Sequence, residues 1–237
     1  MIALYTVGGI FGALACIKLG DLLGRRMTIF IATVTSMIGA ILMATSFSLA
    51  QFIVARIVVG LGTGGYTATV PVWQSEISKV SNRGAHVVIE GFFVGWGITI
   101  ALWIDFAFFF IKHNSVSWRF PLVLQVVFSL IVMGFIFTFP ESPRWLIKKD
   151  RVQEAREIMA VLDDTSPDSE QVSQDIADIQ QSLAIAGTGS LKDLFRMGQQ
   201  RIFHRVVIAA TGQMFQQMCG INLITFYAVS SDECLCK

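Results

Sequence analysis

Charged residues are scarce in this sequence. Asp, Glu, Lys and Arg make up only 15% of its 237 residues, whereas 54% are hydrophobic, and the mean hydropathy is +0.63. About a quarter of the residues of an ordinary soluble domain are charged, so this composition excludes such a domain and indicates an integral membrane protein. The formal net charge is +1, and no basic segment is interleaved with aromatic residues, so nothing points to nucleic acid as a partner.

Cysteine and histidine are also rare. The four cysteines fall in apolar stretches (Cys16 and Cys219) or in the last residues of the chain (Cys234 and Cys236), which gives neither a disulfide framework nor the spacing of a metal site. The three histidines are scattered along the chain, at His86, His113 and His204. Because no nucleophile, metal cluster or cofactor motif accompanies them, we expect no metal, no cofactor and no enzymatic activity.

Long apolar stretches dominate the rest of the sequence. Six of them reach the roughly 20 residues that a helix needs to cross a bilayer, near 1–19, 28–47, 50–71, 85–110, 119–139 and 205–229. Their hydrophobicity is continuous and does not alternate with period two, which favours helices over a transmembrane barrel. The predicted fold class is an all-α membrane protein with six spans.

Lys and Arg residues predict the orientation. They gather in the first break (Lys18, Arg25 and Arg26), in the third (Lys79 and Arg83) and after the fifth span, and such clusters mark cytoplasmic loops. The first residue is then outside, although no signal peptide or hydrophilic leader precedes the first span. We therefore expect a further span ahead of residue 1. Residues 230–237 form a short polar tail after a single sixth span, so we expect a fragment or a truncated gene product.

The segment PESPRWL, residues 140–146, ends the continuous apolar part of the chain. Pro140 cannot donate a backbone hydrogen bond and disfavours helix in the residue before it, so a span should end there. Ser142 followed by Pro143 predicts a helix N-cap with proline at the first helical position. Arg144 puts positive charge just outside the span, and Trp145 suits the headgroup layer.

Residues 142–204 are polar enough for water and show helical periodicity. Two apolar faces repeat at three-to-four spacing, with Val152, Ala155, Met159 and Leu162 in the first and Val172, Ile176, Ile179 and Leu183 in the second. Ser166 and Pro167 predict the start of the second helix, and Ser190 with Asp193 predicts a short third helix that ends at Gly198. A disordered acidic linker over 163–190 is the alternative.

Several motifs stand in a fixed order along the chain. They are GDLLGRR at 20–26, Arg56 followed by Gly60, Gly62 and Gly64, PVWQSE at 71–76, Arg83-Gly84, PESPRWL at 140–146, and Gln216, Gln217, Gly220 and Asn222. Together they resemble the sugar porter family of the major facilitator superfamily. The wording VPVWQSE at 70–76 and WIDF at 103–106 is most similar to the fungal branch of that family.

The resemblance covers the chain up to about Val229 and implies an organisation and a function. The six spans would be helices two to seven of a twelve-helix fold: 1–139 an incomplete N-terminal transmembrane half with five spans, 140–204 an intracellular helical linker domain, 205–229 the first helix of the C-terminal half, and 230–237 the tail. The implied function is transport of sugars, monosaccharides above all, by alternating access in the plasma membrane, either facilitated or as symport with protons. The alternative is a truncated membrane fragment that does not transport.

The sequence departs from the family pattern at several positions. Ile17 stands where a glycine is usual and Leu22 where relatives often have a basic residue. Gly91 and Ile98 replace polar residues that bind sugar in many relatives, so the hexose pattern does not transfer directly. Phe226 and Tyr227 replace a common Tyr pair, which keeps the aromatic bulk and loses one hydroxyl.

Three polar residues inside the predicted spans are candidates for a site, because an ionisable residue in a membrane usually faces a cavity or the protein interior. Arg56, Asp105 and Gln125 lie at comparable depth from the outer side, and we expect Arg56 to pair with Asp105 or to hydrogen-bond Gln125. In the alternative, Arg56 reaches to the outer interface without a partner. Gly60 and Gly64 give a small face for close helix packing.

The sixth predicted span carries the candidate sugar contacts. Gln213, Gln216 and Gln217 share one helical face, and the last two lie near the middle of the bilayer, where secondary transporters hold substrate. Amide side chains suit a neutral polyol because each offers a donor and an acceptor. Gly220 lets the helix loosen so that Asn222 can turn toward the same cavity, and helix packing is the alternative role for a single Gln. The family pattern adds Phe226 and Tyr227.

Charged residues at the predicted cytoplasmic face form a further candidate set. Its members are Asp21, Arg25, Arg26, Glu76, Arg83, Glu141 and Arg144. We expect their opposite charges to meet and to latch the outward-open state. Topology signals and a simple helix stop are the alternatives.

Overall fold

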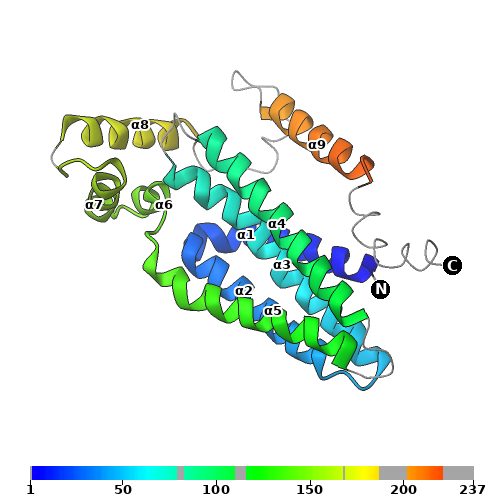
Figure 1. Ribbon diagram of the computed structural model, residues 1–237. Helices are drawn as coiled ribbons and strands as arrows, with labels where there is room; N and C mark the ends of the chain where they lie inside the picture. The colour runs from blue at the N-terminus through cyan, green and yellow to red at the C-terminus, as the bar shows by residue number, and fades with distance from the viewer. Residues whose placement is uncertain (1, 79–82, 110–115, 168, 187–201, 221–237) are drawn as a thin grey trace.

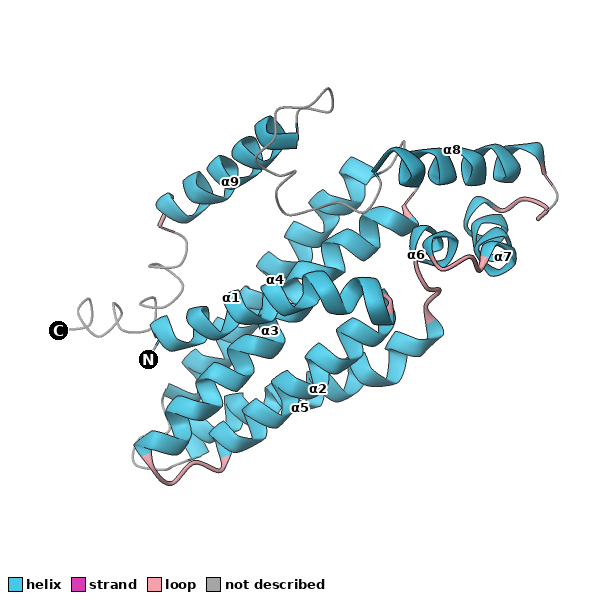
Figure 2. Ribbon diagram, turned by 180° about the vertical axis from the view of Figure 1, so that it is seen from behind, coloured by secondary structure: helices cyan, strands magenta, loops and turns pink. Residues whose placement is uncertain are grey.

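The computed structural model describes residues 2–78, 83–109, 116–167, 169–186 and 202–220. Helices account for most of these residues, and no strand occurs among them. In chain order they are α1 (Ile2–Leu23), α2 (Arg25–Ala44), α3 (Leu49–Ile77), α4 (Arg83–Phe109), α5 (Val116–Phe135), the 3-10 turn η1 (Ile136–Thr138), α6 (Pro143–Lys148), α7 (Val152–Asp163), α8 (Glu170–Ala186) and α9 (Ile202–Met218). Figure 2 shows the same all-helical content from behind.

The helices α1 to α5 are each long and apolar enough to cross a membrane. This confirms the all-α fold and the first five predicted spans. In Figure 1 these long helices lie side by side, the short helices α6 to α8 gather at one end of them, and α9 lies apart from the bundle. The described part of α9 has 17 residues. Residues 221–229 lie outside the described part, so the sixth span stays a prediction.

Helix α3 is the longest of the bundle, with 29 residues. It begins after Ser48, whose side chain accepts a hydrogen bond from the backbone N–H of Gln51 at 3.2 Å. At 1.5 Å per residue the helix is about 43 Å long, whereas the hydrocarbon core of a bilayer is about 30 Å thick. Helix α3 is therefore longer than the hydrocarbon is thick, and its last turn, which carries Glu76, lies at the end of the bundle where α6 lies.

Glycines bring α1 and α3 into backbone contact. They are Gly8 and Gly12 in α1 and Gly60 and Gly64 in α3, and a Cβ atom on any of the four would overlap with a carbonyl oxygen of the other helix. Small residues allow membrane helices to approach this closely. The packing role predicted for Gly60 and Gly64 is confirmed. Their partners in α1, Gly8 and Gly12, were not predicted.

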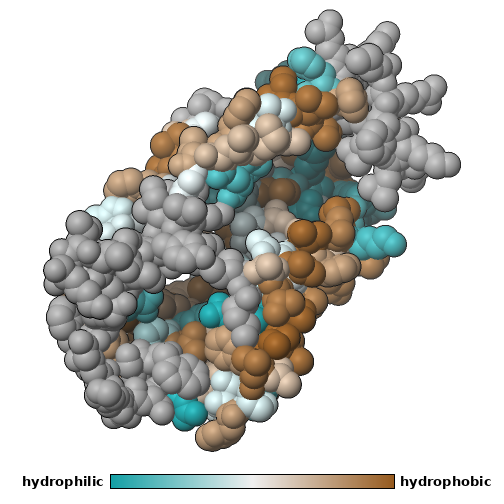
Figure 3. Space-filling model, turned by 90° about the vertical axis from the view of Figure 1, so that its right-hand side faces the viewer, coloured by the Kyte–Doolittle hydropathy of each residue, from teal (hydrophilic) through white to brown (hydrophobic). Residues whose placement is uncertain are grey.

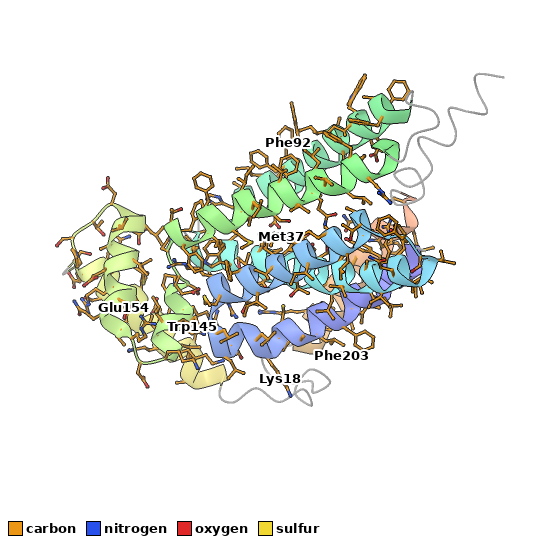
Figure 4. The ribbon with its side chains drawn as sticks, turned by 90° about the horizontal axis from the view of Figure 1, so that it is seen from below. Lys18, Met37, Phe92, Trp145, Glu154 and Phe203 are labelled. Carbon is orange, nitrogen blue, oxygen red and sulfur yellow. The ribbon has the colours of Figure 1, made fainter. Side chains whose placement is uncertain are left out.

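Helix α4 is packed much more loosely. A Cβ atom on Gly91, Gly95 or Gly97 would meet no other heavy atom within 4 Å. Large apolar side chains of α4, among them Phe92, are exposed, and Phe92 lies on the outer side of the helix in Figure 4. Apolar surface also covers much of the face drawn in Figure 3, as expected for helices whose natural solvent is lipid.

The short helices α6 to α8 share a small core of their own. Its buried residues are Leu146, Ile147, Ala155, Met159, Val172 and Ile176, with Ile179 and Leu183 packed against them. Both predicted apolar faces are therefore present, except that Leu162 lines a separate pocket of about 450 Å³ with Trp73 of α3 and His86 of α4. The helix over 170–186 excludes a disordered linker there.

One predicted helix start was wrong. Helix α8 begins at Glu170, and not after Ser166 and Pro167, because the hydroxyl of Ser169 accepts a hydrogen bond from the backbone N–H of Val172 at 3.4 Å. A serine has to sit three residues before a free N–H to cap it, and Ser169 meets that condition. The short third helix predicted between Ser190 and Gly198 lies outside the described residues.

Candidate transport site and charge network

A bidentate ion pair between Arg25 and Glu76 joins α2 to α3 at the end of the bundle where α6 lies. The guanidinium of Arg25 donates to both carboxylate oxygens of Glu76, from Nε at 3.0 Å and from Nη2 at 3.1 Å. The side chains are only 17% and 11% exposed, and Asp21 adds a carboxylate oxygen 3.9 Å from Arg25. Such bidentate pairs are strong and fix geometry, so this pair holds the ends of α2 and α3 in register.

The side chain of Glu141 caps the N-terminus of α2. One of its oxygens accepts hydrogen bonds from the backbone N–H groups of Arg25 at 2.9 Å and Arg26 at 3.3 Å, and also from that of Ser142 at 3.1 Å. The first N–H groups of a helix lack partners within the helix, and the partial positive charge at that end favours a carboxylate. A residue far along the chain thus supplies the cap that the residue before α2 does not.

The residue before α2 is Gly24, and the cap depends on it. Its φ is +91°, which is unfavourable for residues with a side chain, and a Cβ atom there would lie 2.8 Å from an oxygen of Glu141 and 3.3 Å from the ring of Trp145. Glycine at this position therefore lets the carboxylate reach the helix end.

Residues of α6 dock on the end of α1. The indole N–H of Trp145 donates to the backbone oxygen of Asp21 at 3.1 Å, and the ammonium of Lys148 lies 2.9 Å from the Asp21 carboxylate. Figure 4 shows Trp145 at the junction between the short helices and the bundle. The predicted N-cap is confirmed, since the hydroxyl of Ser142 accepts from the backbone N–H of Trp145 at 3.3 Å.

Five of the seven predicted network residues lie together. Four have been described above, and the fifth is Arg26, whose Nη2 donates to the backbone oxygen of Phe137 at 2.6 Å and whose Cζ lies 5.6 Å from the centre of that ring. Arg144 does not join them. It is exposed, and Lys148, one helical turn further along α6 (about 5.4 Å), reaches Asp21 in its place. The side chain of Arg83 lies outside the description.

A cavity of about 920 Å³ lies within the bundle, between α1, α2, α3, α4 and α5. Arg56, Asp105 and Gln125 all line it, so the predicted convergence of these three side chains is observed. The hydroxyl-bearing residues Tyr5 and Tyr66 also line it, and these two were not predicted. An apolar wall with a few polar groups is typical of small-molecule sites.

The predicted direct contacts of Arg56 are not formed. Its guanidinium lies over the ring of Phe52, with Cζ 5.2 Å from the ring centre, and its Nε is buried without a hydrogen-bond partner. The amide of Gln125 donates to the hydroxyl of Ser36 at 3.3 Å instead, and no ion pair joins Arg56 to a carboxylate of the described residues. Arg56 folds toward the helix start, as side chains in helices tend to do, which is closer to the alternative prediction.

The glutamines predicted to bind sugar are only partly described. Gln213, Gln216 and Gln217 share a face of α9 and are exposed. None of them lines the cavity, because its described lining comes from α1 to α5. The remaining predicted contacts, Asn222, Phe226 and Tyr227, lie outside the described residues.

Comparison with known proteins decides the family. The family model described as "Sugar (and other) transporter" matches residues 1–230. The chain belongs to this sugar transporter family. Two of its relatives come from the yeast Saccharomyces cerevisiae. They are Sugar transporter STL1, 40% identical over 230 residues (94% of this chain and 40% of the yeast protein), and Low-affinity glucose transporter HXT1, 31% identical over 233 residues (96% and 40%).

Solved structures agree on the fold. The structure of the proton:xylose symporter XylE bound to 6-bromo-6-deoxy-D-glucose superposes with a TM-score of 0.82 at 23% identity, over 96% of this chain and 50% of that chain. At this identity the likeness shows the fold, that of the major facilitator superfamily. The chain spans about 40% of the length of the two yeast relatives and half of XylE.

Two of the positions where this sequence departs from the family pattern, Gly91 and Ile98, lie on α4. Ile98 lines the cavity and adds an apolar side chain to its α4 wall. Gly91 does not line it. Asp105, also on α4, is the ionisable group of that wall, and the sequence had predicted it as one of three intramembrane polar candidates.

Proposed function

We propose that this chain forms the larger part of one half of an alternating-access sugar transporter. The intramembrane cavity carries the proposal, because it joins one apolar wall to the polar groups of Arg56, Asp105 and Gln125 in a chain of the sugar transporter family. Residues 1–139 would belong to the N-terminal half, 140–204 to the intracellular linker, and 205–229 to the start of the C-terminal half. The glutamines of α9 would complete the site from the other side.

We propose monosaccharides as the substrates. The support comes from relatives described as glucose transporters and from XylE, which is described as a proton:xylose symporter. Symport with protons and a plasma-membrane location are part of the same proposal. The network around Arg25, Glu76 and Glu141 would latch the outward-open state and release when the halves change position.

Uptake of radiolabelled glucose and xylose in a host that lacks hexose transporters tests this function. The chain alone and any longer reading frame that contains it are compared in the same host. We expect saturable uptake from the longer protein, and background uptake from the chain alone. Background uptake from both, with both present in the membrane, would favour the fragment that does not transport.

The glutamine contacts are tested in the longer protein. Replacing Gln217 by Ala removes a donor and an acceptor that a neutral sugar needs, so saturable uptake should fall at least about tenfold, the equivalent of roughly 1.4 kcal/mol. Gln180→Ala, an exposed glutamine on α8, is the matched control and should transport normally. Unchanged uptake and apparent affinity in Gln217→Ala would remove this residue from the site.

A further inference from the structure

The chain contains two Ser-Pro pairs, and the structure places them in opposite environments. Ser142, which precedes Pro143, is buried with an exposed fraction of 0%, and its hydroxyl accepts the hydrogen bond that caps α6. Ser166 precedes Pro167, and both of these residues are exposed. The same dipeptide is therefore inside the protein at one position and accessible from the solvent at the other.

Ser166 lies between the end of α7 and the start of α8. In Figure 1 and in Figure 2 this segment is on the side of the short helices that faces away from the bundle. The turn is held by backbone atoms, since the N–H of Ser169 donates to the carbonyl oxygen of Ser166 at 3.0 Å. A residue before proline favours an extended backbone. Protein kinases bind their substrates as accessible, extended segments, and one large group of them requires proline directly after the serine.

A cation stands beside Ser166. Nη1 of Arg156, on α7, donates to the carbonyl oxygen of Pro167 at 3.2 Å and to the hydroxyl of Ser173, on α8, at 3.1 Å. A guanidinium has five N–H groups and can bind a phosphate through two of them. Because Pro167 directly follows Ser166, a phosphate on the Ser166 hydroxyl would be within reach of this guanidinium.

Carboxylates are also close to Ser166 in the chain. Asp164 and Glu170 carry negative charges that disfavour a phosphate between them, but both residues are exposed, and water and salt screen exposed charges. Arg156 is half-buried, so its attraction is screened less. The N–H groups at the start of α8 favour an anion as well. The local charges therefore leave room for a phosphate with Arg156 as its partner.

We propose that Ser166 is a phosphorylation site for proline-directed protein kinases and that Arg156 binds the phosphate. The Ser166 oxygen attacks the γ-phosphorus of ATP, so that a new O–P bond forms and the bond from this phosphorus to the departing ADP oxygen breaks. The hydroxyl proton passes to a base of the kinase. Bound to Arg156, the phosphate would fasten the segment before α8 to α7. The inference rests on the proposed function only for the cytoplasmic position of these helices, where ATP and kinases are found.

Incubation of the purified chain with a mitogen-activated protein kinase and ATP tests the site. Mass spectrometry should find phosphate on Ser166 and none on Ser142, whereas synthetic peptides of residues 138–147 and 162–171 should both be substrates. Ser166→Ala should remove the label, and Pro167→Ala, which keeps the hydroxyl, should lose most of it. No phosphate on Ser166 in the folded chain, or equal labelling of Ser142, would overturn the proposal. Sugar uptake is not involved, so this failure is distinct from a failure of the proposed function.

Phosphorus NMR of the phosphorylated chain tests the role of Arg156. A phosphoserine loses its second proton at about pH 6, and a neighbouring cation favours the doubly charged form. The midpoint of this titration should therefore move to higher pH in Arg156→Gln, by roughly half a unit. Arg151→Gln is the matched control, because Arg151 pairs with Glu154 at the other end of α7, and it should leave the midpoint unchanged. The same midpoint in Arg156→Gln and in the unchanged chain would show that Arg156 does not bind the phosphate.

Discussion

At the scale of single residues, one carboxylate has an effect out of proportion to its size. Glu141 accepts the backbone N–H groups at the start of α2, and it fits there because Gly24 has no side chain. Without the carboxylate these donors would have no partner in the protein. The beginning of α2 is therefore stabilised by a residue of the segment that joins η1 to α6.

Replacing Glu141 by Ala should lower the thermal stability of the chain in detergent. Loss of a helix cap together with a charge at the helix start costs roughly 1–2 kcal/mol. Arg144→Ala, three residues away and exposed, is the matched control and should leave the melting temperature unchanged. An equal effect of the two substitutions would mean that the cap contributes nothing.

The sequence also shows its limits at this scale. The motif at 140–146 predicted that Glu141 belongs to the network, but it ranked Arg144 with it, where the structure has Lys148. Both are basic, and the choice between them depends on which turn of α6 faces Asp21. The rotation of α6 about its own axis cannot be predicted from the hydrophobic periodicity or the motif, because it is set by how Trp145 and Leu146 pack.

At the scale of helices, the bundle has a tight side and a loose side. Glycines lock α1 and α2 onto α3, whereas α4 meets its neighbours with open space at its glycines. The existence and approximate limits of the five spans were predictable, because about 20 apolar residues can do little else in a bilayer than form a helix. The lengths of the spans did not predict which helices contact each other. The packing role of Gly8 and Gly12 could be recognised only once the structure placed them against Gly60 and Gly64.

A glycine-to-alanine substitution should destabilise the tightly packed side of the bundle and leave the loosely packed side unaffected. Gly64→Ala places a Cβ on the backbone of α1, and such overpacking costs about 1–3 kcal/mol or more, so the melting temperature and the yield of folded chain should fall. Gly95→Ala in α4 meets nothing within 4 Å and should be neutral or slightly stabilising. A similar loss in both variants would contradict the packing described for α1 and α3.

At the scale of the whole molecule, the short helices are joined to the bundle through charges at one membrane face. The buried Arg25 and Glu76 pair lies within the bundle, and the pair of Lys148 with Asp21, about half exposed on both sides, lies between the bundle and α6. Burial makes the first pair the stronger of the two, since exposed pairs contribute about 0–1 kcal/mol. The first pair is thus the better candidate for a latch.

A double-mutant cycle measures this difference. Arg25→Gln, Glu76→Gln and their combination should give a coupling energy of about 1–3 kcal/mol in thermal unfolding, because each single variant leaves one buried charge unpaired. The same cycle on Lys148 and Asp21 should give less than about 1 kcal/mol. Coupling energies of equal size would show that burial does not distinguish the two pairs.

The glycine contacts between α1 and α3 also have a consequence for the synthesis and membrane insertion of the protein. Helix α1 leaves the ribosome before α3, and roughly fifty residues separate Gly8 from Gly60, which at about 5–20 residues per second is a delay of several seconds. During that time the glycine face of α1 lacks the α3 backbone that it contacts in the folded bundle. A nascent chain that inserts in this order must keep α1 within reach until α3 arrives. The glycine face of α1 that later packs on α3 is therefore accessible, until α3 is inserted, to insertases or chaperones in the membrane that bind new spans.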